Sequence, residues 1–176
     1  MSTSGIAVSK YDEMCEAATA ARKSWIAREG RCRQYMATFL QGLITYCGIP
    51  RDQVTLMRWD KDQQLYREPD GDNQKYQVPG AIEYDAEGDY WHLSVAITLT
   101  PRGSFPRQWV SFVLCVSEAD DGKPMARVSL IGQLRQIDFA DPQQCNALYD
   151  FIVDSTKRSF REGQKSAKAI GFAVGS

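Results

Sequence analysis

Apolar and small residues recur along residues 11–47 at the spacing of an α-helix. Gly30 interrupts the pattern, so the segment is either one helix with a weak point or two helices. Gly48 and Pro50 predict its end, because glycine caps a helix and proline cannot continue one. Intervals of three, four and seven residues put the recurring residues on one stripe: Met14, Ala18, Ala21, Trp25, Cys32, Met36, Phe39 and Leu43.

The period of the pattern changes to two in the middle of the chain. Alternation of apolar and polar residues predicts half-buried strands. Short polar connections that contain glycine, at residues 85–89 and 120–124, are typical of antiparallel neighbours. We therefore expect an antiparallel β-meander of about five strands. The segments with the clearest strand pattern are residues 53–59, 90–99, 109–117 and 126–134.

A long helix is predicted at the C-terminal end of this pattern. It begins at Asp141-Pro142, because Asp caps the free amides and proline at the first helical position loses no hydrogen bond. It is expected to end near Arg161, followed by a flexible C-terminal tail over residues 163–176. The sequence thus predicts a single α+β domain over residues 1–162, with an N-terminal helical segment, the meander and a C-terminal helix.

Two architectures fit this order of elements. In the first, the helices cover one face of the sheet. In the second, the sheet curls around the C-terminal helix, which is the element order of a helix-grip fold and would enclose a small-molecule cavity lined by Trp91, Phe112 and Tyr149. The order of elements alone does not separate them.

Composition places the chain among folded proteins. Apolar residues make up 43% and charged residues 24%, which is close to globular averages. The sequence has no run of about 20 apolar residues and no apolar stretch typical of a signal peptide, so we expect no membrane association and a cytoplasmic location. The five cysteines are odd in number and widely spaced, which predicts reduced thiols.

Charge is unevenly distributed around a net value of −1. Residues 60–90 hold nine acidic and three basic side chains, whereas residues 1–59 hold eight basic and five acidic ones. The N-terminal segment is therefore a candidate for nucleic-acid contact, although a solvated helix face is favoured because the net charge is near zero. The candidate contact residues are Arg22, Lys23, Arg28, Arg31 and Arg33.

Few residues of the sequence point to catalysis. His92 is the only histidine, and its phase with Tyr90 and Ser94 is typical of an ordinary histidine on a sheet surface. The acidic residues Glu83, Asp85, Glu87 and Asp89 lie at a predicted hairpin tip, where turn chemistry selects Asp and Gly, so a solvated turn is favoured over a cation site.

One motif comparison bears on catalysis. Pro69-Asp70 followed by Glu83-Tyr84-Asp85 resembles the PD-(D/E)xK nuclease pattern, but Asp85 stands where that family has its lysine. The sequence therefore predicts no catalytic residue, no metal site and no cofactor, and an enzymatic function is not favoured.

The second face of the meander is more apolar than a solvated sheet face should be. Ala96, Trp109, Val113, Cys115 and Ile131 lie opposite the main core rows, so either the N-terminal helices or a partner should cover them. We therefore predict a non-enzymatic protein-interaction or assembly module, and a homodimer in which residues 11–47 contribute to the interface. The predicted interaction residues are Trp25, Trp109, Val113 and Ile131.

Overall fold

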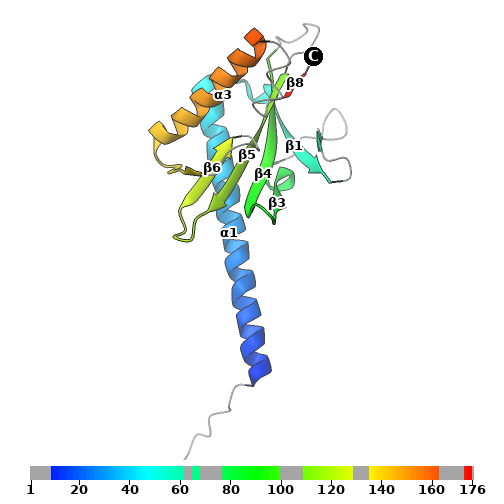
Figure 1. Ribbon diagram of the computed structural model, residues 1–176, viewed down its shortest axis with the longest axis vertical. Coiled ribbons are helices and arrows are strands. Elements are labelled where there is room, and N and C mark those ends of the chain that lie inside the picture. The colour runs from blue at the N-terminus through cyan, green and yellow to red at the C-terminus, as the bar shows by residue number, and fades with distance from the viewer. Residues whose placement is uncertain are drawn as a thin grey trace, which may run out of the picture. The chain divides into compact units, whose positions relative to one another are not determined.

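The computed structural model describes residues 9–61, 65–67, 77–99, 109–128, 135–162 and 173–175. These residues form a mixture of helices and antiparallel strands, which confirms the α+β class (Figure 1). No helix in the described ranges combines the length and apolarity needed to span a bilayer. The elements in order are α1 (Lys10–Cys47), a 3-10 turn (Arg51–Gln53), β1 (Val54–Asp60), β2 (Leu65–Arg67), α2 (Val78–Ala81), β3 (Glu83–Asp85), β4 (Tyr90–Thr98), β5 (Trp109–Glu118), β6 (Pro124–Val128), β7 (Arg135–Gln136), α3 (Pro142–Glu162) and β8 (Ala173–Gly175).

The chain divides into two compact units, Met1–Arg31 and Cys32–Ser176. Helix α1 contributes to both, since it is one helix of 38 residues and Gly30 does not end it. This resolves the choice between one helix and two over residues 11–47. All the buried residues of α1 lie in the second unit: Cys32, Met36, Phe39, Leu40 and Leu43.

The ends of both long helices follow the local signals in the sequence. Gly48 has a φ of 64°, its amide donates to the Thr45 carbonyl at 3.3 Å, and the Ile49 amide donates to the Ile44 carbonyl at 3.0 Å. This pair of hydrogen bonds is the Schellman motif that a C-terminal glycine allows. At the start of α3, the Gln143 amide donates to Asp141 Oδ1 at 2.9 Å, as the predicted cap requires.

The second unit is built on one antiparallel sheet. Within the described residues it has eight strands, more than the expected number, in the order β2-β1-β4-β5-β6-β7, with β3 also pairing with β4 and β8 with β5. Strands β4 and β5 form the centre, from Trp91 opposite Val116 to Thr98 opposite Trp109. The additional strands are short, and their pairing partners lie far away in the sequence or across a turn.

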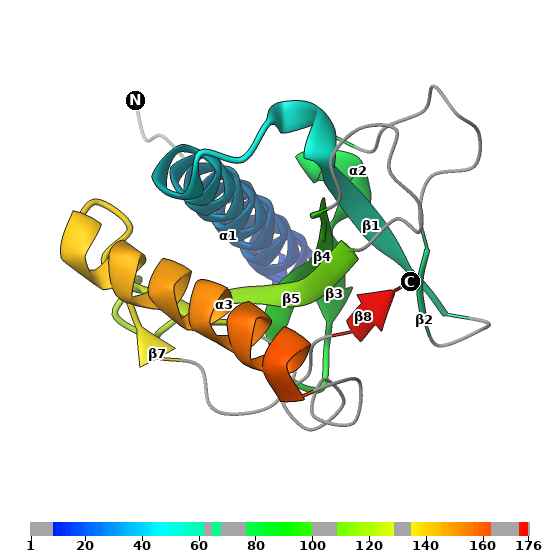
Figure 2. The same cartoon turned by 90° about the horizontal axis from the view of Figure 1, so that it is seen from above.

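The core lies between one face of the sheet and two helices. Residues of α3 and of the C-terminal part of α1 bury this face together, and Figure 2 shows α3 beside that part of α1. The arrangement matches the first of the two expected architectures, in which the helices cover one sheet face. Trp91, Phe112 and Tyr149, the predicted cavity lining, instead belong to this packed core.

Three residues of the expected C-terminal tail form a strand. Residues 163–172 and Ser176 lie outside the described part of the chain, but Ala173–Gly175 form β8 and pair with Trp109–Ser111 of β5 (Figure 2). Among the described strands, β6 pairs with Leu114–Glu118 and leaves the edge of Trp109–Ser111 to β8. An unpaired strand edge is a template for a further strand, which explains the pairing.

Candidate functional site

In the first unit, contacts between neighbouring residues fix the start of α1. The Asp12 amide donates to Ser9 Oγ at 3.1 Å, while the Ser9 amide donates back to Asp12 Oδ2 at 3.1 Å. Hydrogen bonds from Ser9 lower the pKa of Asp12. Lys10 and Glu13 form an ion pair of 2.9 Å one turn apart. The helix is therefore set at residue 10 by capping and not by packing.

An apolar stripe on this helix faces solvent. Every residue from Ser9 to Ala27 is exposed, including Tyr11 at 73%, Met14 at 70% and Trp25 at 42%. Steps of three and four residues link Tyr11, Met14, Ala18, Ala21 and Trp25 to Cys32 and Phe39 further along the helix. In the second unit the same stripe is buried, whereas in the first it is exposed. We call Tyr11, Met14, Ala18, Ala21 and Trp25 the exposed stripe.

The two halves of this helical segment carry opposite charge. Residues 10–16 contain Asp12, Glu13 and Glu16 with one lysine, whereas residues 22–31 contain four cations and one carboxylate. The middle of the segment is rich in alanine, which has the highest helix propensity and allows another backbone to approach closely. Its alanines are Ala17, Ala18, Ala20 and Ala21.

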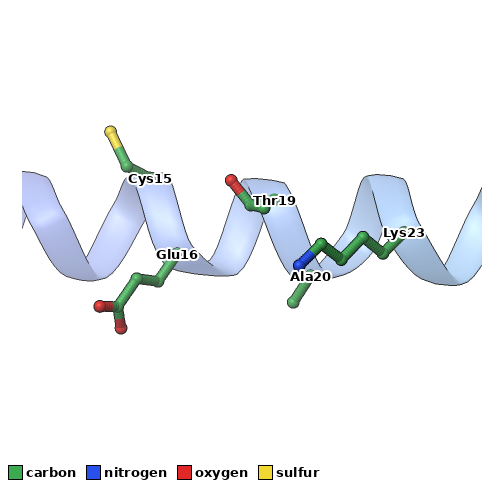
Figure 3. A pocket seen from close by; sticks show the side chains of 5 residues that line it. All are labelled: Cys15, Glu16, Thr19, Ala20 and Lys23. Atoms are coloured by element: carbon green, nitrogen blue, oxygen red, sulfur yellow. The ribbon is translucent and has the colours of Figure 1, made fainter.

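A shallow hollow of about 370 Å³ lies along the same helix but away from the stripe. Figure 3 shows that all its lining residues come from one helix, with Cys15 and Thr19 pointing one way and Glu16 the other. A ligand site normally encloses most of its ligand between several elements. One helix cannot do this, so the hollow is not a binding pocket.

Part of the second sheet face is buried by β2, an element that the sequence did not predict there. Val113, Tyr90 and Cys115 form a second small core cluster, and Tyr66 of β2 packs against it. The sequence pattern predicted that the N-terminal helices or a partner would cover this face, whereas at this cluster β2 does so. Val113 is 7% exposed and cannot contact a partner directly, Trp109 is half-buried, and Ile131 lies outside the described residues.

Four ionisable residues align across this face. The strand registers place Glu83 opposite His92, His92 opposite Cys115 and Cys115 opposite Arg127. His92 is 8% exposed and Cys115 is fully buried, so His92 is not the surface residue that its phase predicted. We call these residues the polar row.

Aromatic residues surround the polar row. The Tyr66 hydroxyl lies 2.7 Å from His92 Nδ1, and the rings of Trp59 and Tyr90 lie 6.4 and 5.9 Å from the imidazole. The Arg127 guanidinium lies 4.8 Å from the centre of the Tyr90 ring, a cation–π distance. The row is thus held by hydrogen bonding and ring contacts on one side of the sheet.

Burial sets the charge state of the polar row. It lowers the pKa of His92, and it raises the pKa of Cys115 although Arg127 opposes this effect. Burial and a hydrogen bond with Asp85 raise the pKa of Tyr90 to about 12. At neutral pH the imidazole and the thiol are therefore uncharged, and a neutral thiol is a weak nucleophile. The row can tie four strands together, but the thiol is not activated.

The predicted acidic cluster is engaged in local structure. Glu83 pairs with Arg58 at 2.9 Å, and Asp85 Oδ1 accepts the amides of Glu87 at 2.9 Å and Gly88 at 3.2 Å. A hydrogen bond from Tyr90 lowers the pKa of Asp85. In the ranges that the structure describes, no three His, Cys, Asp or Glu side chains are grouped as metal ligands. Pro69 and Asp70 lie outside those ranges.

An open groove of about 480 Å³ lies between β6, β7 and α3. Its apolar lining includes Val128, Ile137, Leu148 and Phe151, and Arg135 is exposed at its border. The volume is within the range of small-molecule pockets. Arg127 of the polar row also lines the groove, whereas Trp91, Phe112 and Tyr149 of the predicted core cavity do not.

The basic residues proposed for nucleic-acid contact are divided between the two units. Arg22, Lys23, Arg28 and Arg31 belong to the first unit, and Arg33 to the second. Successive residues of a helix point about 100° apart, so Lys23 and Arg28 lie on sides of α1 different from Arg22. A strip of cations along one side of the helix is therefore not present within residues 22–31.

Searches against known proteins add no functional information. No family model, curated protein or solved structure matches this chain. The case for each candidate site therefore comes from this structure alone. Of the exposed stripe, the polar row and the groove, the exposed stripe covers the longest stretch of the chain.

Proposed function

We propose that the protein is an assembly module that self-associates through the exposed stripe of α1. The carrying observation is that one stripe of one helix is buried from Cys32 onward but exposed from Tyr11 to Trp25. Apolar residues that repeat every three and four residues along a helix are typical of helix pairing. A second helix laid along the stripe would remove these side chains from water.

Helix energetics support this proposal. An isolated helix of about 12–15 residues is marginal in water, and packing supplies most of the stability of helices in proteins. Capping and a high alanine content stabilise the helix from Lys10 to Ala27, but none of its residues is buried, so packing adds no stability there. Burying a large apolar side chain contributes about 1.5–3 kcal/mol, so burial of Met14 and Trp25 would favour association.

A matched pair of substitutions tests the proposal. Ala18 and Ala20 are both exposed, but a separation of two residues, about 200°, puts Ala20 on the side away from the stripe. Ala18→Glu would place a carboxylate in the apolar seam, which costs several kcal/mol unless it is paired. We expect Ala18→Glu to raise the dissociation constant of the dimer at least about tenfold, equivalent to about 1.4 kcal/mol. Sedimentation equilibrium measures this constant.

Ala20→Glu is the control, since it adds the same charge to the same helix. It should change the dissociation constant little. Equal weakening by both substitutions would show that the stripe is not the interface, and a chain that remains monomeric at every concentration would reject self-association.

A second candidate function is binding of a small apolar molecule in the groove between β6, β7 and α3. The groove volume and the exposed Phe151 side chain favour it. Phe151→Ser should then weaken binding of an environment-sensitive apolar dye, while the exposed Asp150→Ser should not. Equal dye binding by both variants would reject the groove as the site.

A further inference from the structure

We propose that the exposed stripe pairs with the exposed stripe of a second copy and that the two helices run antiparallel. This inference rests on the proposed self-association. The two-fold axis then passes between Thr19 and Ala20. Residues whose numbers add up to 39 face one another, which sets Met14 against Trp25 of the second copy and Ala18 against Ala21 of the second copy.

The residue types along the stripe favour this direction. The next stripe position after Trp25 is Arg28, which continues the spacing of three and four. A parallel pair would bring Arg28 against Arg28 of the second copy, and like charges in such a layer repel. In the antiparallel pair Arg28 meets Tyr11 of the second copy, and a guanidinium over a tyrosine ring is attractive. The alanine layers let the helices approach closely at the axis.

Charge on the rest of the segment favours the same direction. Residues 10–16 are acidic in net charge and residues 22–31 are basic. An antiparallel pair sets the acidic half of each helix over the basic half of the other, whereas a parallel pair sets like halves together. Opposite charges within about 10 Å attract at moderate salt, and added salt screens them. The antiparallel dimer should therefore weaken as salt is raised.

Disulfide trapping distinguishes the two directions without changing the stripe. Ala17 and Ser24 lie seven residues apart on one flank of the stripe, and Glu29 lies on the other flank. In an antiparallel pair the same flanks meet, so Ala17 comes within about 3 Å, along the axis, of Ser24 of the second copy. In a parallel pair opposite flanks meet, which brings Ser24 beside Glu29 of the second copy.

The experiment mixes variants of the full chain that each carry one introduced cysteine, in a Cys15→Ser background, under mild oxidation. We expect Ala17→Cys with Ser24→Cys to form a covalent dimer at least about tenfold faster than Ser24→Cys with Glu29→Cys. The reverse ratio would overturn the antiparallel assignment but leave self-association standing. Slow crosslinking in both mixtures, with a dimeric mass, would place the interface elsewhere and overturn the assignment too. A monomeric mass would reject the proposed function itself.

Discussion

Two glycines inside α1 should respond in opposite ways to the same substitution. Alanine is favoured over glycine in a helix interior by about 1 kcal/mol, so Gly→Ala is normally stabilising there. At Gly30 a new Cβ atom would have nothing within 4 Å. At Gly42 it would overlap the Tyr149 hydroxyl oxygen and lie 3.0 Å from Tyr149 Cζ. We expect Gly30→Ala to be neutral or stabilising and Gly42→Ala to be destabilising.

The magnitude at Gly42 follows from what Tyr149 would lose. Its hydroxyl donates to the Phe39 carbonyl at 3.2 Å, its ring lies 5.0 Å from the Phe39 ring, and the residue is buried. Displacing it removes a hydrogen bond of about 1 kcal/mol, and overpacking a core costs about 1–3 kcal/mol more. After the gain in helix propensity, the net loss in the free energy of unfolding is about 1–3 kcal/mol.

Urea unfolding of both variants, followed by circular dichroism, measures these changes. With a slope of about 1–3 kcal/mol/M, a loss of about 2 kcal/mol moves the midpoint by roughly 1 M. Tyr149→Phe removes the overlapping oxygen, so Gly42→Ala should cost less in that background than in the natural chain. If Gly42→Ala proved as stable as the natural chain, the packing of α1 against α3 described above would be wrong.

Three further predictions concern the second unit and the thiols. Burial lowers the pKa of His92 below its ordinary value of 6.5, and Lys61 lowers it further, whereas Asp85 and Glu83 raise it. As pH falls, the imidazole is therefore protonated in the unfolded chain before it is protonated in the folded chain. The free energy of unfolding should then decrease as pH drops below about 6.5. His92→Gln should flatten that part of a stability-against-pH curve, and an unchanged slope would contradict the burial of His92. In native protein, Ellman's reagent should label exposed Cys15 well before buried Cys115, an order that Cys15→Ser should abolish; equally fast labelling of Cys115 would contradict its burial. Mg²⁺, Ca²⁺ and Zn²⁺ should leave the melting temperature unchanged, since Glu83 and Asp85 are engaged locally; a shift that Asp85→Asn removes would show a cation site.

Local chemistry made several elements predictable from the sequence. The Asp141 cap and the Gly48 terminus depend on residues within one turn of each other, and both follow the expected hydrogen bonds. Strands β4 and β5 are long enough for alternation to be read directly. Such signals need no knowledge of the rest of the fold.

Features set by distant contacts were not predictable in the same way. β8 pairs with the edge of β5 at Trp109–Ser111, and its three residues carry no strand pattern of their own. His92 is buried because Tyr66 and Trp59, more than 25 residues earlier in the chain, pack over it. Alternation correctly placed His92 on the face of Tyr90, but whether that face is covered depends on β1 and β2.

The mass of the natural chain in solution tests the proposed assembly most directly. Light scattering after size exclusion, at micromolar concentration, should give twice the 19.8 kDa of one chain. Trp25→Glu, which puts a charge at the end of the exposed stripe, should return the mass to that of one chain. A mass of 19.8 kDa for the natural chain, unchanged by Trp25→Glu, would contradict assembly through α1.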